Sequence, residues 1–377
     1  MAAATVLFLH SSAGRYGADR QLVTLASGLD RRRFTPLAVL PERGELAGLL
    51  EEGGVEVWAT PLAVLRRAEL GPRAVRHAIR PAVGELESLA RSRGVALVHS
   101  NTSVILSGRP LARRLGVPHV QHVRELYPRV PLAWPLWRGR LMRSDRLLCV
   151  SRAVAAQFPP SRRVAVVHDG LTAPPPRGGR AAARAALGMR ADAFAVAVLG
   201  RVSDWKGQDV LARALADERL ASIGAVGLVA GAPWPGAEGA LRELERIGET
   251  FGLGDRLRLV GFQADVGALL GAVDAVAVPS TRPDPFPNAA LEAAAAGVPV
   301  VAAAHGGLPE MLRDGETGLL VEPGNPAALA IALRSLADDS ERAERIGRAA
   351  AADVAARFSA ERMVAGVEAQ YDALLLS

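Results

Sequence analysis

The chain has 377 residues, 50% of them hydrophobic, and a formal net charge of +6, so it is long enough to build two domains that each bury an apolar core. Its single cysteine, Cys149, excludes a disulfide framework and a cysteine-based metal site, and it suits a reducing compartment. The longest later apolar stretch, residues 293–304, is broken by Gly297 and Pro299 and is too short for a bilayer, so we expect a cytoplasmic protein without a transmembrane segment.

The positive charge is confined to the first half of the chain. Residues 1–171 carry 25 arginines and 13 acidic residues, whereas residues 172–377 carry 20 basic and 26 acidic residues. A basic half suits an anionic partner such as a lipid headgroup, a phosphorylated acceptor or a nucleic acid, although an arginine-rich composition would give the same excess. Aromatic residues make up only 4% of the chain and no nucleic-acid-binding motif accompanies the charge, so we expect no nucleic acid partner.

The N-terminal run MAAATVLFLH lacks the basic flank of a signal peptide, and we interpret it as the first strand. From there, short apolar runs alternate with segments of helical length, which predicts an α/β fold of parallel sheets covered by helices. The first strands are expected at residues 5–10, 35–40, 55–59, 96–99, 117–122, 146–150 and 164–167. They would form a Rossmann-like domain over residues 1–171.

The alternation stops at residues 171–180, where three consecutive prolines and two glycines exclude a helix or a central strand. We therefore expect a linker over residues 172–192. A second Rossmann-like domain, residues 193–358, has strands expected at 194–199, 224–230, 257–260, 275–278, 298–302 and 318–321. The tail, 359–377, has apolar residues at helical spacing, and we expect this helix to return to the N-terminal domain; the residues are Met363, Val367, Tyr371, Leu374 and Leu375.

Ligands of open α/β sheets bind beyond the carboxyl ends of the strands, so the loops that follow the strands are the candidate sites. One such loop, GRVSDWKG, places Arg201 and Lys206 before a helix that begins near Gln208. Two cations and the unpaired N–H groups of a helix N-terminus favour a diphosphate. Lys206 is also the only lysine among 45 basic residues, which argues against an ordinary solvated loop.

A second loop, PSTRPDPFPNAALEAAAAG, contains the acids Asp284 and Glu292. We expect Asp284 in the loop, a helix starting at Pro287, and Glu292 within that helix facing the same cleft. Carboxylates so placed can accept hydrogen bonds from sugar hydroxyls, although a helix cap and a solvated side chain would have the same spacing. Glu292 lies in the apolar stretch LEAAAAG, where an unpaired carboxylate would be costly.

With these motifs, and with LVGF, VDAVAVPS and HGGLPEMLRDGETGLLVEPGN further on, the chain resembles the retaining nucleotide-sugar glycosyltransferases of family 4, which have the GT-B fold of two Rossmann-like domains facing across a cleft. The resemblance implies that Arg201 and Lys206 bind the donor diphosphate, Asp284 the sugar and Glu292 the ribose, with Phe286 and Asn288 beside them. The family normally has glutamate at both acidic positions and glycines where this chain has Pro285 and Pro287, which removes two backbone donors.

Four further loops are assigned in part by the same resemblance. In SSAGRYGADRQ, only Gly17 matches the family's glycine-rich loop, and it would lie near the donor. In HVQHVREL, the resemblance favours His122 as a partner of the transferred sugar, with Arg124 and Glu125 on the acceptor side and His119 on the other face. In VHSNTS, Ser100 and Asn101 would line the acceptor side or cap the following helix. In HGGLPEM, Gly306, Gly307 and Glu310 would lie beside the donor, although Glu310 suits the helix dipole equally.

No two aspartates stand one residue apart, so the Asp-x-Asp metal motif of the other major glycosyltransferase architecture is missing. We expect catalysis without a metal or cofactor, with Arg201 and Lys206 stabilising the departing diphosphate and with Arg201, Lys206, Asp284 and His122 as the catalytic residues. The resemblance implies a hexosyltransferase of class EC 2.4 that retains the anomeric configuration. Its donor would be a UDP- or GDP-linked sugar and its acceptor a glycan, a lipid-linked precursor or a small molecule, in bacterial envelope polysaccharide or glycoconjugate synthesis.

Three alternatives differ in kind. Residues 129–146 mix tryptophan and leucine with five arginines and could rest on the anionic inner face of a membrane, or pack into the core. A non-catalytic nucleotide-sugar sensor of the same fold would explain the replacement of the first glutamate and its flanking glycines. A Rossmann dehydrogenase lacks support, because no G-x-G-x-x-G loop follows the first strand of either half.

Overall fold

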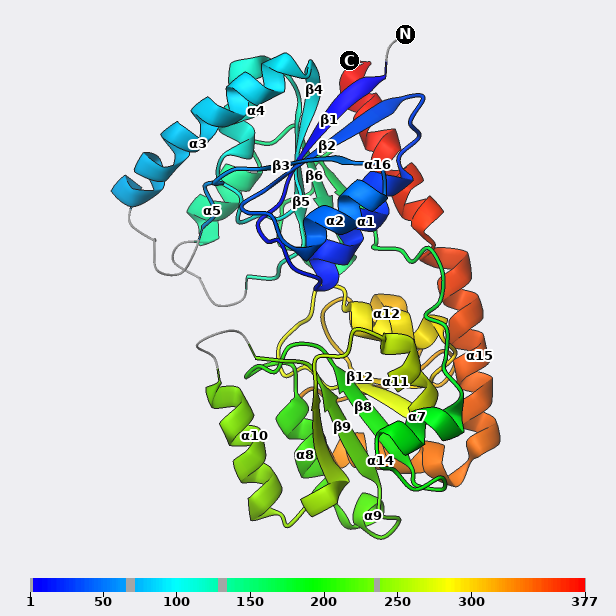
Figure 1. Ribbon diagram of the computed structural model, residues 1–377. Helices are drawn as coiled ribbons and strands as arrows, with labels where there is room; N and C mark the ends of the chain where they lie inside the picture. The colour runs from blue at the N-terminus through cyan, green and yellow to red at the C-terminus, as the bar shows by residue number, and fades with distance from the viewer. Residues whose placement is uncertain (1–2, 66–71, 128–133, 234–237, 377) are drawn as a thin grey trace. The chain divides into compact units, whose positions relative to one another are not determined.

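The computed structural model describes residues 3–65, 72–127, 134–233 and 238–376, with the side chains of residues 72–78 outside the description. The chain divides into two compact units. Unit 1 consists of Met1–Thr172 together with Phe358–Ser377, and unit 2 consists of Ala173–Arg357. Each unit is built around its own parallel sheet, and each is described by itself (Figure 1).

Unit 1 has a seven-stranded sheet in the order β3-β2-β1-β4-β5-β6-β7. The strands are β1 (Ala4–Leu9), β2 (Phe34–Leu40), β3 (Glu56–Ala59), β4 (Val95–Ser100), β5 (His119–Val123), β6 (Arg146–Cys149) and β7 (Val164–Val166). The helices are α1 (Gly17–Gly28), α2 (Glu45–Glu52), α3 (Pro72–Ser92), α4 (Gly108–Leu115), α5 (Trp134–Leu141), α6 (Arg152–Ala155) and α16 (Ala360–Leu375).

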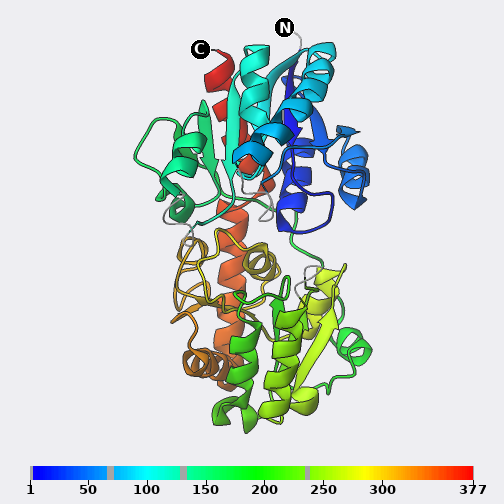
Figure 2. The same ribbon diagram turned by 90° about the vertical axis from the view of Figure 1, so that its left-hand side faces the viewer.

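The C-terminal helix α16 belongs to the core of unit 1. Its apolar side chains Met363, Val367 and Tyr371 are buried among residues of β1, β2 and α1. The hydroxyl of Tyr371 lies 2.6 Å from His99 Nδ1 on β4. The red helix α16 lies beside α1 in Figure 1, and Figure 2 shows it running along the same sheet. Unit 1 is therefore completed by residues from the far end of the chain.

Unit 2 has a six-stranded sheet in the order β10-β9-β8-β11-β12-β13. The strands are β8 (Ala195–Leu199), β9 (Val226–Ala230), β10 (Leu257–Gly261), β11 (Ala275–Val278), β12 (Val300–Ala303) and β13 (Leu319–Val321). The helices are α7 (Arg180–Ala186), α8 (Gln208–Ala216), α9 (Glu218–Ala221), α10 (Gly239–Thr250), α11 (Val266–Ala272), α12 (Asn288–Ala295), α13 (Leu308–Met311), α14 (Pro326–Asp338) and α15 (Ser340–Arg357), with a 3-10 helix at Gly254–Arg256.

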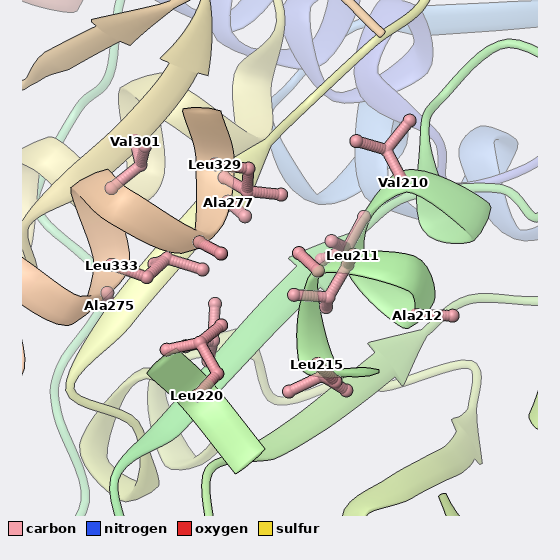
Figure 3. Packing of buried hydrophobic residues seen from close by; sticks show 14 of the residues in the cluster. Val210, Leu211, Ala212, Leu215, Leu220, Ala275, Ala277, Val301, Leu329 and Leu333 are labelled. Atoms are coloured by element: carbon pink, nitrogen blue, oxygen red, sulfur yellow. The ribbon is translucent and has the colours of Figure 1, made fainter. Parts of the chain in front are cut away.

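Aliphatic side chains from helices and strands form the core of unit 2. Helices α8 and α14 pack against each other, and Leu211, Leu329 and Leu333 gather with Ala277 of β11 in one buried cluster (Figure 3). The strands are apolar on both faces, as expected for parallel strands covered by helices on both sides. Every strand predicted from the sequence overlaps a strand of the structure.

The segment expected to be a linker, residues 172–192, differs from that expectation. Its alanine-rich part forms helix α7, which packs against α11 within unit 2. The buried guanidinium of Arg184 fixes this helix, because its Nη2 lies 2.8 Å from Asp274 Oδ2 and its Nε donates to the carbonyl of Ala272 at 2.9 Å. The prolines and glycines before residue 180 therefore lead into a folded element.

Both sheets have their topological switch point beside the first strand of the unit. In unit 1, β1 pairs with β2 on one side and β4 on the other, and in unit 2, β8 pairs with β9 and β11. Connections leave in opposite directions from such a strand, and the crevice at its carboxyl end is where sheets of this kind bind ligands. The candidate residues follow β1, β4 and β5 in unit 1 and β8, β11 and β12 in unit 2.

Candidate functional site

The loop between β8 and α8 is held close to the end of β11. Gly207 has φ +79°, and a Cβ there would lie 2.0 Å from the carbonyl oxygen of Pro279, so only glycine allows this approach. The N–H of Thr281 donates to the carbonyl of Trp205 at 2.8 Å, and Gln208 Nε2 donates to the carbonyl of Arg201 at 2.9 Å. Arg201 and Lys206 thus lie on one fixed loop at the N-terminus of α8.

Lys206 and Asp284 meet across this switch point. Lys206 Nζ lies 2.6 Å from Asp284 Oδ2, and it also lies 4.4 Å from the centre of the Trp205 ring, within cation–π range. The Lys206 side chain is 24% exposed and that of Asp284 only 6%. The ammonium therefore has a buried counter-charge, and the Lys206 side chain is partly exposed.

Two glycines of the loop after β12 hold Asp284 in place. The N–H of Gly307 donates to the carbonyl of Asp284 at 2.8 Å. Gly306 has φ +62°, and a Cβ there would lie 2.2 Å from the same carbonyl oxygen, while a Cβ on Gly307 would lie 2.1 Å from the carbonyl oxygen of Pro285. The close approach that these glycines permit is therefore to the backbone of the acidic loop.

The remaining residues predicted for unit 2 are arranged around this cluster. The helix α12 begins at Asn288 with Pro287 as its N-cap, one residue later than predicted, and Glu292 lies within it as predicted and is buried. Phe286 is buried between Asp284 and the helix. Glu310 lies in the short helix α13, where its carbonyl accepts a hydrogen bond from Arg357 Nη2. The structure thus brings Lys206 into contact with Asp284, and Gly306 and Gly307 into contact with the backbone of the loop that carries Asp284.

A cavity of about 320 Å³ lies beside the β8–α8 loop, on the side that faces α10. It is lined by Val202, Ser203, Asp204, Gln208 and Asp209, and by Gly239, Ala240, Glu243 and Leu244 of α10. Its charged lining residues are all acidic, so electrostatic repulsion disfavours a diphosphate there. The cationic side of the loop, where Lys206 lies, is the better phosphate site.

In unit 1, the loop after β1 contains a buried polar network. His10 Nε2 lies 2.7 Å from Asp19 Oδ1, and Asn101 Nδ2 lies 3.1 Å from His10 Nδ1. Burial alone would raise the pKa of Asp19, but hydrogen bonds from His10, Ser12 and the Tyr16 N–H outweigh it and hold this pKa below its usual value. Asp19 also caps α1, which begins at the predicted cleft residue Gly17.

His122 lies inside β5, which runs on to Val123, and its ring is fully buried. The ring packs against that of His99, with 5.4 Å between the ring centres, whereas His119 on the opposite face lies 3.0 Å from the hydroxyl of Ser100. Burial, and then the charge of Arg124, lower the pKa of His122 well below its usual value, so the ring is neutral. Strand β5 thus runs one residue beyond the expected end at residue 122, and the role of His122 toward the transferred sugar stays a prediction.

Arg124 is the first residue after β5, and its Nη1 lies 2.7 Å from both carboxylate oxygens of Asp169. Glu125 accepts hydrogen bonds from the hydroxyl of Ser103 at 2.5 Å and from the N–H of Arg124 at 2.9 Å. Burial raises the pKa of Glu125 in spite of these bonds. Ser100 is hydrogen-bonded to His119 and Asn101 to His10. The following helix α4 has Ser107 as its N-cap, so neither Ser100 nor Asn101 caps it.

Two residues of these clusters, Trp205 and Asp169, were not predicted from the sequence as site residues. Trp205, which lies under the Lys206 ammonium, could have been suspected from its position in the same charged loop. Asp169 follows the predicted strand at 164–167 in the run His-Asp-Gly, which is a strand-end signal of the same kind. Within the described ranges, no three His, Cys, Asp or Glu side chains are grouped closely enough to hold a metal ion. Nor does any described helix have the length and apolar character needed to cross a bilayer.

Two parallel sheets of this strand order, with charged loops at their switch points, are the architecture of the GT-B glycosyltransferases. The chain belongs to glycosyltransferase family 4. Residues 16–172 match the family described as Glycosyltransferase Family 4, and residues 179–353 match the one described as Glycosyl transferases group 1.

Named relatives and solved structures agree with this membership. A D-inositol 3-phosphate glycosyltransferase 1 of Catenulispora acidiphila is 33% identical over 75% of this chain and 67% of its own length. The D-inositol 3-phosphate glycosyltransferase of Streptomyces avermitilis is 39% identical over 55% of this chain, and the matched part spans only about half (48%) of that relative. The crystal structure of Anabaena Alr3699/HepE with UDP and glucose covers 98% of this chain and 99% of its own, at 25% identity and a TM-score of 0.86.

Proposed function

We propose that this protein is a retaining hexosyltransferase that moves a sugar from a nucleoside diphosphate donor to an acceptor hydroxyl. The observation that carries the proposal is the contact between Lys206 and Asp284, a cation and a carboxylate held side by side at the switch point of unit 2. A donor sugar presents the matching groups, a diphosphate and hydroxyls, on adjacent atoms. The relative solved with UDP and glucose favours a UDP-linked donor, and a GDP-linked donor is the second candidate.

Lys206, Arg201 and the first N–H groups of α8 would stabilise the charge that develops on the departing diphosphate. Asp284 would accept hydrogen bonds from sugar hydroxyls, and Glu292 from those of the ribose. Because the Lys206 ammonium already contacts Asp284, the diphosphate and the sugar would be bound by adjacent groups of one cluster. That arrangement would hold the anomeric carbon and its leaving group in a fixed geometry, and such positioning lowers the free-energy barrier of the transfer.

In a retaining transfer of this kind, the bond from the anomeric carbon to the diphosphate oxygen breaks and the acceptor oxygen bonds to the same face. The acceptor proton passes to the departing phosphate oxygen, so no protein base is required. No metal is required either, because the cations of the β8–α8 loop supply the positive charge. The structure of unit 2 supports this assignment through the fixed position of Lys206.

For the acceptor, the named relatives favour a small phosphorylated polyol, since they are D-inositol 3-phosphate glycosyltransferases. A glycan or a lipid-linked envelope precursor is the second candidate. The part of residues 129–146 that the structure describes includes α5, on which Leu136 is 81% exposed; residues 129–133 lie outside the described residues. Exposed leucine beside arginines suits peripheral contact with an anionic membrane, and sedimentation with anionic liposomes at low salt tests it.

The proposal is tested by incubating the protein with UDP-glucose or GDP-mannose and candidate acceptors, and by measuring nucleoside diphosphate release and the anomeric configuration of the product by NMR. We expect acceptor-dependent release and an α-linked product from an α-linked donor. A β-linked product would contradict retention. Donor binding without release under any condition would instead favour the non-catalytic nucleotide-sugar sensor, which the replacement of the family's glutamate by Asp284 keeps as the alternative.

A further inference from the structure

The carboxyl ends of three neighbouring strands in unit 1 bring polar side chains together. Strands β1, β4 and β5 are consecutive in the sheet, and they are followed directly by His10, Asn101 and Arg124. This is the switch point of unit 1, the position at which a sheet of this order has a ligand crevice. His10 and Asn101 are fully buried, and the Arg124 side chain is only 7% exposed.

Arg124 uses only part of its guanidinium within the described structure. Its Nη1 lies 2.7 Å from both oxygens of Asp169, but Nε and Nη2 are buried and have no partner among the described residues. These two nitrogens form the side edge of the guanidinium, whose parallel N–H groups match the two oxygens of a carboxylate or a phosphate. Leaving such charged donors buried and unpaired is costly, so their retention points to a ligand or to trapped water.

The groups packed around Arg124 are neutral or already paired. His122 lacks a partner at either ring nitrogen, His99 lacks one at Nε2, and Asn101 lacks one at Oδ1, among the residues that the structure describes. Burial, followed by the charge of Arg124, lowers the pKa of both histidines well below the usual value, so they add no charge.

Two carboxylates are hydrogen-bonded to Arg124, and a phenol is bonded to the neighbouring His99. Asp169 offsets part of the Arg124 charge. Glu125 accepts hydrogen bonds from the Ser103 hydroxyl and the Arg124 N–H, and the Tyr371 hydroxyl is bonded to His99. Among the described residues at this switch point, the Nε–Nη2 edge of Arg124 is therefore a buried cationic group without a hydrogen-bond partner.

We infer that the Nε–Nη2 edge of Arg124 binds an oxyanion, a phosphate or a carboxylate, carried by one of the two substrates. The inference rests on the proposed function, because it takes the bound oxyanion to be part of a substrate. It deepens that function by adding a second anionic group besides the diphosphate of the donor. Asp169 acts as a positioning residue, because it holds Nη1 and so sets the direction of the free edge. The acceptor and the transferred sugar are the two possible carriers of the oxyanion.

Binding of inorganic phosphate to the full chain tests the site directly. By isothermal titration calorimetry, Arg124→Lys, which keeps the charge but loses the paired donors, should weaken phosphate binding about tenfold or more. Asp169→Asn keeps an oxygen that can hold Nη1 but removes the competing negative charge, so it should strengthen phosphate binding several-fold, whereas a purely structural ion pair would give no such gain. Arg113→Gln, at an exposed arginine on α4, is the matched control and should leave the affinity for phosphate unchanged.

Phosphate binding that is absent from the wild type, or unchanged in both Arg124→Lys and Asp169→Asn, would overturn the inference.

Turnover then separates the two sources of the oxyanion. Each protein is assayed with D-inositol 3-phosphate against inositol as acceptor, and with UDP-glucuronate against UDP-glucose as donor. A loss in Arg124→Lys confined to the phosphorylated acceptor assigns the oxyanion to the acceptor, and a loss confined to the uronate donor assigns it to the sugar. Equal activity of wild type and variant on all four substrates would contradict the inference. If the wild type turns over no donor, the proposed function fails, and the phosphate titration still decides whether Arg124 binds an oxyanion.

Discussion

Asp284 is one methylene shorter than the glutamate that family 4 usually has at this position, yet it reaches Lys206 at 2.6 Å. The reach comes from the backbone, because Gly306 and Gly307 allow the loop after β12 to lie directly against residues 284 and 285. Lys206 in turn packs its ammonium on Trp205. An arginine would present a wider, planar group here, which explains why a chain with almost no lysine has one at this position.

Replacement of Gly306 by alanine should displace the acidic loop. The added Cβ would combine a positive φ with a 2.2 Å approach to the carbonyl oxygen of Asp284, so we expect a loss of about 2–4 kcal/mol in the free energy of unfolding together with weaker donor binding. Gly315→Ala is the control, because Gly315 has φ +75° but open space around its Cβ position, and it should lose only about 1 kcal/mol. Urea denaturation measures both, and equal losses would show that the contact with Asp284 is unimportant.

At the scale of elements, strands β4 and β5 place three histidines in the interior of unit 1. His99, His119 and His122 are all buried, and burial is the largest cause of their lowered pKa values; that of His119 falls to about 3. The unfolded chain would protonate these rings near their ordinary value of about 6.5. Protons therefore bind to the unfolded state first as the pH falls.

We accordingly expect the free energy of unfolding to decrease as the pH is lowered from 6.5 to 5, by up to about 1.4 kcal/mol per pH unit for each of these histidines. Stability decreases with falling pH because the pKa values of these histidines are lower in the folded state than in the unfolded state. His119→Gln should reduce the slope by up to one such contribution, and thermal or urea unfolding at several pH values measures it. A stability that rises toward pH 5, or an unchanged slope in the variant, would refute the buried neutral state.

How far the sequence predicts the structure is seen at β5 and at the β8–α8 loop. Apolar runs predicted each strand, and strand ends identified the loops that carry Arg201, Lys206 and Asp284, because buried parallel strands have a strong local signal. The pairings were not predictable, since Lys206 and Asp284 are 78 residues apart and Arg124 and Asp169 are 45 apart. His122 shows the limit of such predictions. Side chains alternate between the two faces of a strand, so a strand that ends at Val123 and not at residue 122 changes which side chain lies at its carboxyl end.

For the whole molecule, each unit has its own sheet, its own switch point and its own cluster of polar side chains, cationic and acidic in unit 2 and centred on Arg124 in unit 1. The C-terminal helix α16 ties the far end of the chain to unit 1 through Tyr371 and Glu368. Under the proposed function, unit 2 would bind the nucleotide and unit 1 would bind the oxyanion of a substrate.

Under the proposed function the reaction should also proceed without a divalent cation, because Arg201 and Lys206 would supply the charge that a metal would otherwise provide. We expect transfer rates measured in excess EDTA to stay within about twofold of those in Mg²⁺. A drop of tenfold or more that Mg²⁺ or Mn²⁺ restores would contradict this expectation.

We expect Lys206 to bind the donor diphosphate, and the affinity of the protein for UDP and GDP measures this contribution. Isothermal titration calorimetry on Lys206→Met should show binding about 10–100-fold weaker than the wild type, the cost of losing a charged hydrogen bond. Arg282→Met, which removes a neighbouring cation paired with Asp204 instead of Asp284, should stay within about threefold. Wild-type affinity in Lys206→Met would contradict the binding of the diphosphate by Lys206.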